Sequence, residues 1–251
     1  MLRSTLLACV ACLAFAANAQ AQINIVAGSN LQTFGSAPPS SQWSTSFYTH
    51  ASNPASNTAA QNTAQLQTLS ISGIANTLPT SSTNPPSSDS SARYNTTNLN
   101  LQTIPTGNAA TFLAARLTNG TGLNVTSLNL GYDLKIAQST LSTEQYPGHY
   151  LYYSLTGASN SWTSLGNFGA NGTSSTPTLT PSIDIPVGTW TSGSPLYIVW
   201  IDDNADAGTE AAYQIDDVTF TPTVVPEPAT LALLGVAGGI AGLAALRRRK
   251  A

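Results

Sequence analysis

Apolar and polar residues alternate with a period of two through the middle of the chain. The segment SLNLGYDLKI, residues 127–136, has an apolar side chain at every second position. Because successive side chains of a strand point to opposite faces, this predicts a half-buried strand. LYIVWI, residues 196–201, is apolar throughout, which indicates a central strand covered on both faces. The pattern predicts further strands at 23–27, 66–72, 111–117, 150–155, 183–187 and 213–220.

Clusters of Gly, Pro, Asn and Ser, such as TGASNS and TSGSP, separate these runs, and the region between the two ends shows no long helical pattern. Many short strands joined by turn-forming residues predict an all-β fold, an antiparallel β-sandwich spanning residues 22–220. Residues 37–63 and 79–91 are poor in large apolar side chains, and we expect them to form long surface loops. Residues 221–225 are expected to be a short stalk.

The N-terminus has the pattern of a secretory signal peptide, residues 1–21. Arg3 supplies the positive charge, residues 6–17 form an apolar run, and small-residue cleavage sites end at Ala19 and Ala21. The sequence therefore predicts an exported chain.

Few reactive or charged side chains remain once this peptide is set aside. Cys9 and Cys12 both lie within it, so the exported chain has no disulfide and no thiolate ligand or nucleophile. Residues 22–225 hold three basic residues and ten carboxylates, a net charge of −7. Because such a surface repels a polyanion, we expect no nucleic-acid partner.

The C-terminus joins an apolar run to a basic cluster. Residues 229–246 are eighteen residues without a charge, near the shortest helix that spans a bilayer core of about 30 Å. Four cations follow at 247–250, and the positive-inside rule places them in the cytoplasm. We expect a single transmembrane helix that holds the sandwich on the outer side of the inner membrane.

A Pro-Glu-Pro tripeptide precedes this run, and residues 226–251 resemble the PEP-CTERM sorting signal of Gram-negative bacteria. The resemblance implies a substrate and not an enzyme. An exosortase would recognise the tripeptide, cut nearby, and release the chain from the membrane to the cell surface or exopolysaccharide matrix. Some ice-binding proteins carry the same tail. The resemblance rests on Pro226, Glu227, Pro228, Arg247, Arg248, Arg249 and Lys250.

A second resemblance covers residues 117–222, which look like the jelly-roll ectodomain often joined to PEP-CTERM tails. The most specific part of this similarity is a strand that carries Ile-Asp-Asp-Val, residues 215–218. It implies a jelly-roll-like sandwich.

Six of the ten carboxylates of the predicted sandwich lie between residues 202 and 217. Oxygen donors recur there at alternate positions, as they do in loops that bind Ca²⁺, although Ala207 and Tyr213 depart from the EF-hand pattern. A solvated turn explains the same residues. The candidate Ca²⁺ ligands are Asp202, Asn204, Asp206, Glu210, Asp216 and Asp217.

Three aromatic positions bear on ligand binding. Trp162 and Trp190 are flanked by Ser, Thr and Gly, which makes them the candidates for exposed indoles on which sugar rings could stack, whereas Trp200 is expected in the core. His149 is expected to be a surface ring. The chain contains no nucleophile elbow, zinc-helix motif or phosphate- or dinucleotide-binding loop, so we expect no enzymatic activity and, apart from Ca²⁺, no cofactor.

The function that these patterns favour is that of a non-catalytic, exported surface or matrix protein. As an alternative, the same domain is a carbohydrate-binding or adhesive module that contacts polysaccharide through Trp162, Trp190 and the acidic loop. A third reading, ice binding, requires a flat face with regularly ranked Thr, and the Thr residues of this chain are scattered in sequence.

Overall fold

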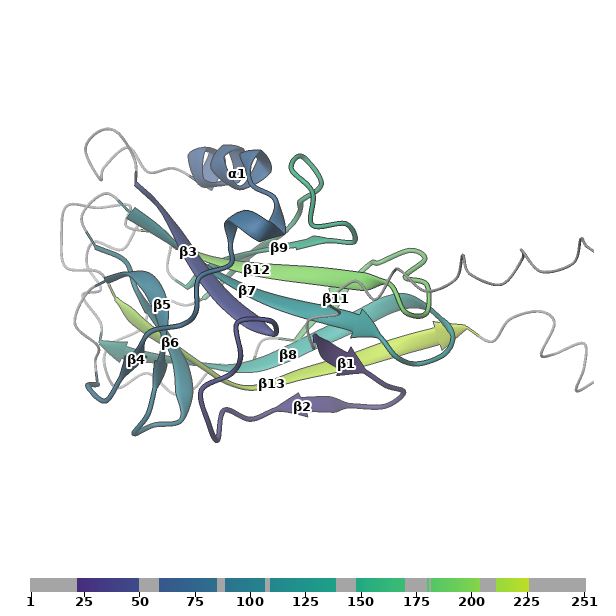
Figure 1. Ribbon diagram of the computed structural model, residues 1–251, viewed down its shortest axis with the longest axis horizontal. Helices are drawn as coiled ribbons and strands as arrows, with labels where there is room; N and C mark the ends of the chain where they lie inside the picture. The colour runs from purple at the N-terminus through teal and green to yellow at the C-terminus, as the bar shows by residue number, and fades with distance from the viewer. Residues whose placement is uncertain are drawn as a thin grey trace, which may run out of the picture.

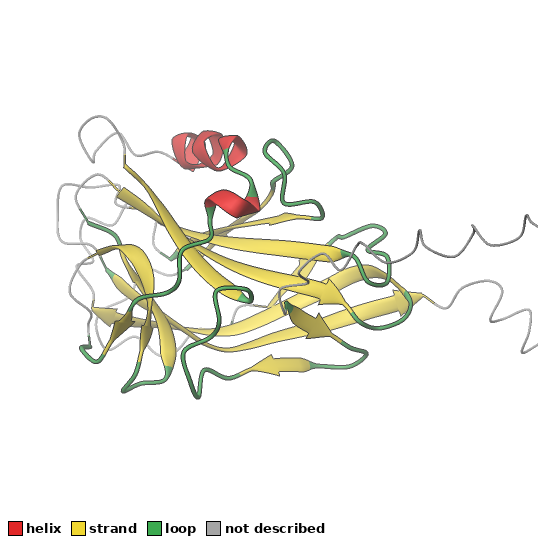
Figure 2. Ribbon diagram, viewed as in Figure 1, coloured by secondary structure: helices red, strands yellow, loops and turns green. Residues whose placement is uncertain are grey.

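Two β-sheets pack face to face, and a short helix covers the outer face of one of them (Figures 1 and 2). The computed structural model describes residues 22–49, 59–84, 89–106, 109–138, 148–169, 180, 182–203 and 211–225. The predicted signal peptide and the predicted transmembrane helix lie outside these residues.

The first sheet, sheet A, has the strand order β1-β7-β12-β9-β10, with β3 paired to β7 on the same edge as β1. Strand β1 runs parallel to β7, and the other pairs of this sheet are antiparallel. The strands of sheet A are β1 (Ile23–Ile25), β3 (Trp43–Thr49), β7 (Ala109–Asn119), β9 (His149–Ser154), β10 (Thr163–Phe168) and β12 (Pro195–Asp203).

The second sheet, sheet B, has the order β11-β8-β13-β6-β5-β4, and β2 also pairs with β13. Strands β4 and β5 are parallel. The predicted sandwich is therefore confirmed, but both sheets are mixed and not purely antiparallel. The strands of sheet B are β2 (Asn30–Gln32), β4 (Thr80–Ser81), β5 (Asp89–Asn95), β6 (Asn100–Ile104), β8 (Asn124–Gln138), β11 (Ser182–Ile185) and β13 (Ala212–Val225).

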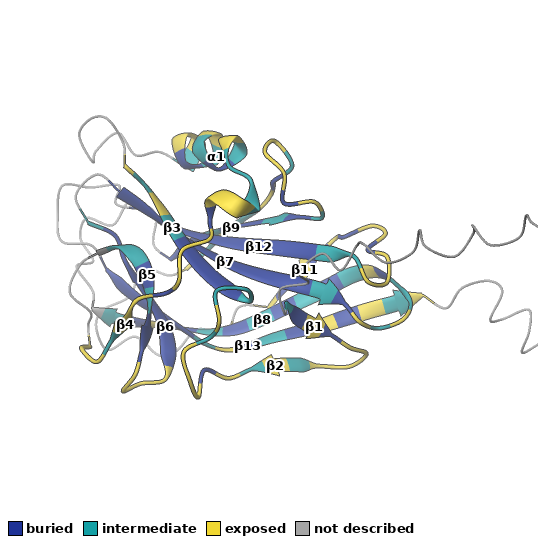
Figure 3. Cartoon of the chain, viewed as in Figure 1, coloured by how far each residue is buried: buried dark blue, intermediate teal, exposed yellow. Residues whose placement is uncertain are grey.

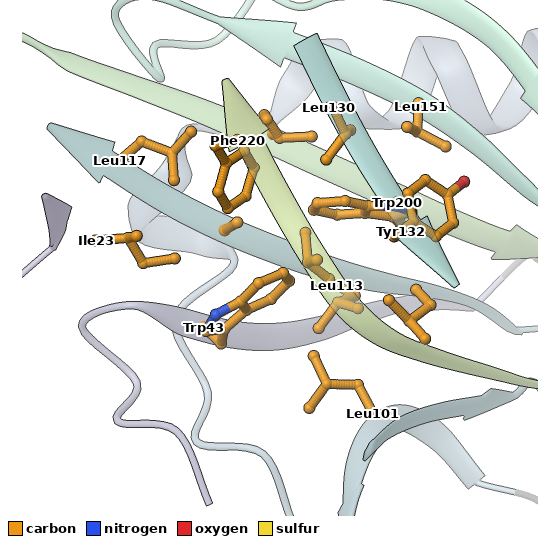
Figure 4. Packing of buried hydrophobic residues seen from close by; sticks show 14 of the residues in the cluster. Ile23, Trp43, Leu101, Leu113, Leu117, Leu130, Tyr132, Leu151, Trp200 and Phe220 are labelled. Atoms are coloured by element: carbon orange, nitrogen blue, oxygen red, sulfur yellow. The ribbon is translucent and has the colours of Figure 1, made fainter. Parts of the chain in front are cut away.

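The main core lies between the two sheets. Leu113 and Leu151 of sheet A meet Leu130 and Phe220 of sheet B there, and all four are fully buried (Figure 4). These side chains come from strands that the sequence pattern predicted, β7, β8, β9 and β13. Removing this apolar surface from water is the main force that holds the two sheets together.

Aromatic rings cross the core from one sheet to the other. Trp200 of β12 lies 5.5 Å from Trp43 of β3 and 6.1 Å from Tyr132 of β8, measured between ring centroids. Phe34 extends the row, 5.4 Å from Trp43 in an edge-to-face arrangement. Trp200 is completely buried, as the sequence predicted. Tilted and edge-to-face aromatic pairs at such distances add stability beyond the area they bury.

A second, smaller cluster covers the outer face of sheet A. Helix α1 (Ala59–Thr68) and a 3-10 turn, η2 (Ile71–Gly73), lie over β7, β12 and β9 (Figures 1 and 3). Leu66 of α1 packs there with Val199 and Ile201 of β12. The continuous apolar run of β12 therefore has one face in each cluster, which confirms its predicted central position.

The predicted strand at 66–72 is wrong. This segment contains the end of α1 and the turn η2. The apolar-polar alternation of LQTLSIS indicated a strand, but Asn62 and Leu66 recur at helical spacing and are the buried positions of α1. Packing of these two residues against sheet A favours a helix over a strand in this segment.

The two predicted loops also contain regular structure. Residues 37–63 include the whole of β3 and the start of α1, and 79–91 include β4 and the start of β5. Strand β3 was not recognised because Ser44 and Thr45 interrupt its apolar pattern, although both are fully buried. The hydroxyl of Thr45 donates to the carbonyl oxygen of Phe112 at 3.0 Å, and this bond offsets the cost of burying a polar group.

Candidate functional site

Strand β13 leads directly into the sorting tripeptide. Its last residues, Val224 and Val225, pair with Val125 and Asn124 of β8. Val224 also packs against the main core. The expected stalk at residues 221–225 is therefore part of sheet B, because its apolar residues continue the inward-facing positions of β13. Pro226, Glu227, Pro228 and the basic residues 247–250 lie outside the described residues.

Three loops surround the end of β13, and with Val225 they form what we call the tail end of the sandwich. They are residues 26–29, 120–123 and 186–194 (Figure 1). The position of each loop follows from pairing: β1 ends beside Asn119, β8 begins beside Val225, and Trp190 bridges to Val125.

Asn119 holds the tail end together. Its side-chain amide donates to the carbonyl oxygens of Trp190 at 2.7 Å and Leu123 at 2.9 Å. Its backbone exchanges hydrogen bonds with the third loop, accepting from the amide of Gly193 and donating to the carbonyl of Ser194. Because polar groups of the second and third loops converge on this one buried residue, these two loops form one ordered surface. Sequence reasoning missed this role.

The tail end carries no charge. Residues 22–34, 118–128, 185–201 and 219–226 contain no Asp, Glu, Lys, Arg or His. Val26 and Val225 are 47% and 48% exposed there. Among the described charged residues, Asp184 on β11 lies two residues before the third loop and Arg116 on β7 lies four residues before the second, while the others lie on β5, β8, β13 and the far end of β12.

The predicted Ca²⁺ ligands fall into separate parts of the fold. Asp202 is fully buried near the end of β12, where it continues the inward-facing positions of Ile198 and Trp200. Asp216 and Asp217 lie on β13 of the other sheet, and Asp217 is exposed. Asn204, Asp206 and Glu210 lie outside the described residues. Within the described residues no group of three or more His, Cys, Asp or Glu could hold a metal, so the acidic-loop site stays a prediction.

Three carboxylates interact on sheet B where β13 carries a bulge. Asp216 pairs with Asp133 of β8, and the register shifts immediately after it. Asp217 adopts a positive φ of 47° there, and its amide donates to the Asp216 carboxylate at 2.9 Å. Partial burial, and then the neighbouring negative charge of Asp217, raise the pKa of Asp133. Burial raises the pKa of Asp216; the hydrogen bond from the Asp217 amide lowers it in part, and the charges of Asp217 and Asp133 raise it again.

The expected exposure of Trp162 and Trp190 is wrong. Trp162 is 4% exposed in the cluster beneath α1, where its indole N–H donates to the carbonyl oxygen of Leu69 at 2.9 Å. Trp190 is 1% exposed at the tail end, and its indole N–H donates to Ser194 at 2.9 Å. Their polar neighbours in sequence indicated exposure, but long-range packing covers both rings. Neither presents a face on which a sugar ring can stack.

His149 is buried and not on the surface. It faces the interior beside Tyr213, with ring centroids 5.3 Å apart, and its Nε2 lies 2.9 Å from the hydroxyl oxygen of Thr103. Burial lowers the pKa of His149 to about 3, so the imidazole is neutral at physiological pH. Its position follows from the alternation of β9, in which Leu151 is the next inward-facing residue. A neutral buried imidazole has a structural role here.

Arg116 is a second residue whose role the sequence did not indicate. It lies on β7 and is 8% exposed beneath η2, where its guanidinium donates to the carbonyl oxygens of Ile71 and Ile74, each at 2.9 Å. A single cation in the apolar strand sequence AATFLAARL was the available signal. These bonds fasten the segment after α1 to sheet A.

The described residues contain no helix that is long and apolar enough to cross a membrane. The predicted span at 229–246 lies outside the described residues.

Comparison with solved structures returned matches at low similarity. One is TmCBM61 in complex with β-1,4-galactotriose, with 11% identity, a TM-score of 0.30, and coverage of 49% of this chain and 70% of that one. Another is the CBM22-1 xylan-binding domain from Paenibacillus barcinonensis Xyn10C, with 8% identity, a TM-score of 0.32, and coverage of 80% and 99%. A third is a cyclase from Fischerella sp. TAU, with 12% identity, a TM-score of 0.31, and coverage of 51% of this chain and 76% of that one. Similarity at this level carries no argument about ligand or catalysis.

Comparison with protein families gave a specific result for the C-terminus. The chain has no significant match among curated proteins. Residues 224–250 match the PEP-CTERM protein-sorting motif, which begins within the last two residues of β13. The motif implies an exported protein that is sorted to the cell surface. The chain thus joins a distinct β-sandwich to a C-terminal PEP-CTERM sorting motif.

Proposed function

We propose that the chain is a non-catalytic exported protein with a jelly-roll-like sandwich, sorted through its C-terminus to the cell surface or exopolysaccharide matrix of a Gram-negative bacterium. Residues 1–21 direct export, and residues 229–246 hold the precursor in the inner membrane with residues 247–250 in the cytoplasm. An exosortase then cuts near Pro226–Pro228 and releases the sandwich.

The observation that carries this proposal is the match of residues 224–250 to the sorting motif, directly after the last strand of a folded sandwich. Pro226 and Pro228 each fix their own φ, and Pro228 also restrains Glu227 from helical conformations. The tripeptide is thereby kept extended, the conformation in which proteases bind substrates. The apolar run and the four cations that follow supply the anchor and its orientation.

The test follows an epitope-tagged full chain by cell fractionation in host strains with and without the exosortase. We expect release of the sandwich in the first strain and retention in the membrane in the second. The triple variant Pro226→Ala, Glu227→Gln, Pro228→Ala should be retained in both. Asp184→Asn removes the same charge from an exposed position on β11 and should be released normally. Release of the triple variant at the normal rate would contradict the proposal.

Carbohydrate binding is not advanced as a second function. Its expected contact residues, Trp162 and Trp190, are both buried. The acidic loop lies largely outside the described residues, so the contacts expected for this function find no support in the described part of the chain.

Ice binding also lacks support from a regular surface. Thr219, Thr221 and Thr223 recur at every second position of β13, which gives one row of hydroxyls. Their partners on β8 are Gly131, Asn129 and Ser127, so the row is not repeated on this neighbouring strand. A regular two-dimensional array is therefore missing from this pair of strands.

A further inference from the structure

The distance between the sandwich and the apolar run is short. Strand β13 ends at Val225, and only three residues separate it from Ala229, where the apolar run begins. Four Cα steps of fully extended chain span at most about 14 Å. The headgroup layer on each side of a bilayer is about 5–8 Å thick. With residues 229–246 in the membrane, the end of β13 lies within about 10 Å of the headgroup surface.

The surface at that end is chemically suited to this position. Its three loops, 26–29, 120–123 and 186–194, contain no ionisable side chain, and their polar groups are Ser, Thr and backbone groups. A bacterial membrane surface carries anionic headgroups, which repel carboxylates. The exposed carboxylate of Asp217 lies on the bulge of β13, farther along the sandwich, whereas that of Asp184 lies on β11, two residues before the third loop and paired with Asn129.

The loops at this end are also ordered. Asn119 ties the second loop to the third, and the amide of Gly120 donates to the carbonyl of Ile25 at 2.8 Å, next to the first loop. Gly120 also leaves room for the side chain of Asn24, because a Cβ there would lie 2.0 Å from the Asn24 side-chain oxygen. An ordered loop surface approaches a membrane without the entropy cost of fixing mobile loops.

We infer that the tail end of the sandwich rests against the phospholipid headgroups of the inner membrane while the precursor is anchored, held there by the short connection to the apolar run. This inference rests on the proposed function, since it requires an anchored precursor. It identifies the face that the sandwich turns toward the bilayer, and it places the sorting tripeptide in the narrow space between the two.

The test places one fluorophore at a time on the full chain. Cys9→Ser and Cys12→Ser remove the native thiols, and the labels are attached at Ala27→Cys or Ser192→Cys in the tail end. Asn98→Cys is the matched control, exposed in the β5–β6 turn. That turn lies beside Asp216, nine residues before Val225 on β13, about 30 Å away along the strand.

The labelled chain is reconstituted into phosphatidylethanolamine–phosphatidylglycerol vesicles that contain a headgroup-attached quencher. We expect several-fold stronger quenching at Ala27 and Ser192 than at Asn98. Equal quenching at all three positions would overturn the inference and leave the proposed sorting intact. Loss of the chain from the vesicles on carbonate extraction would overturn the anchored precursor itself, and with it both proposals.

A second variant tests the role of the connection. A flexible Gly-Ser insertion of about ten residues between Val225 and Pro226 adds roughly 15–20 Å of mean reach. Quenching at Ala27 should then fall to the level at Asn98, while carbonate extraction still leaves the chain in the vesicles. Undiminished quenching at Ala27 would overturn the claim that the short connection holds the contact.

Discussion

His149 links the stability of the sandwich to pH. Its folded pKa is about 3, against an ordinary value of 6.5, because burial disfavours the imidazolium. Between these two values the unfolded chain binds more protons than the folded one, so stability is complete above pH 6.5 and is lost as pH falls toward 3. We expect this loss to reach about 1 kcal/mol per pH unit.

Urea unfolding followed by tryptophan fluorescence at a series of pH values measures this dependence. His149→Gln retains a hydrogen-bonding side chain next to Thr103 but does not titrate, so its stability should vary less between pH 6.5 and 3. An unchanged slope in this variant would assign the acid sensitivity to other groups.

Asp217 contributes repulsion at the bulge of β13. Its charge raises the pKa of both Asp133 and Asp216, so the folded state disfavours the charged form of these carboxyls. The repulsion acts fully at pH values above the raised pKa values of the folded state. It disappears as the pH falls from there to below 3.8, the ordinary pKa, where both carboxyls are neutral in the folded and the unfolded chain. Asp217→Asn should therefore stabilise the fold at pH 7, by less than about 1 kcal/mol.

Asn is the suitable replacement because it tolerates a positive φ better than most residues. The gain in urea midpoint should be present at pH 7 and absent at pH 3. Asp184→Asn removes a carboxylate elsewhere on sheet B and should not show this pH-dependent gain. Equal stabilisation by both variants would indicate an effect of net charge and not of the bulge.

At the scale of elements, α1 and η2 are held to sheet A by Arg116 as well as by apolar packing. Arg116→Met removes the guanidinium and leaves the carbonyls of Ile71 and Ile74 without these bonds, at a cost of about 2 kcal/mol. Hydrogen exchange should accelerate in α1 and residues 71–76, while β8 and β13 are unaffected. Uniform acceleration through both sheets would show that the segment does not open separately.

The sequence predicted an element correctly where a local pattern of apolar and polar residues was enough to specify it. Strands β8 and β12 were recognised because regular alternation and a continuous apolar run each have a single structural solution. Strand β3 and helix α1 were missed because their burial depends on partners far away in sequence, such as the backbone of Phe112. Trp190 was assigned to the surface for the same reason, since it packs into the main core and its backbone bonds to Asn119 and Val125, all distant in sequence.

The same limit applies to the candidate site. The sorting tripeptide and the basic cluster are contiguous in sequence, so their pattern alone identified them, and the family match at 224–250 confirmed it. The tail end is assembled from three loops separated by tens of residues. Its lack of charge was visible in the sequence, but the proximity of the loops required strand pairing.

At the scale of the whole molecule, the fold limits where the precursor can be cut. A protease binds an extended substrate segment, but residues 221–225 are hydrogen-bonded to β8, and Val224 packs against the main core. Cleavage within this segment requires the end of β13 to separate from sheet B. Residues from Pro226 onward follow the last paired position. We therefore expect the released chain to end at or after Val225.

Intact-mass measurement of the released protein locates this terminus. We expect a single C-terminus between Val225 and Ala229 in an exosortase-containing host. Thr223→Pro places a proline in the hydrogen-bonded end of β13 and should loosen its pairing with Ser127, since proline has no amide to donate. The site of cleavage should then extend toward residue 221. A native product that ends before Val225 would show that exosortase unpairs β13, and that the sandwich does not set the boundary of its own processing site.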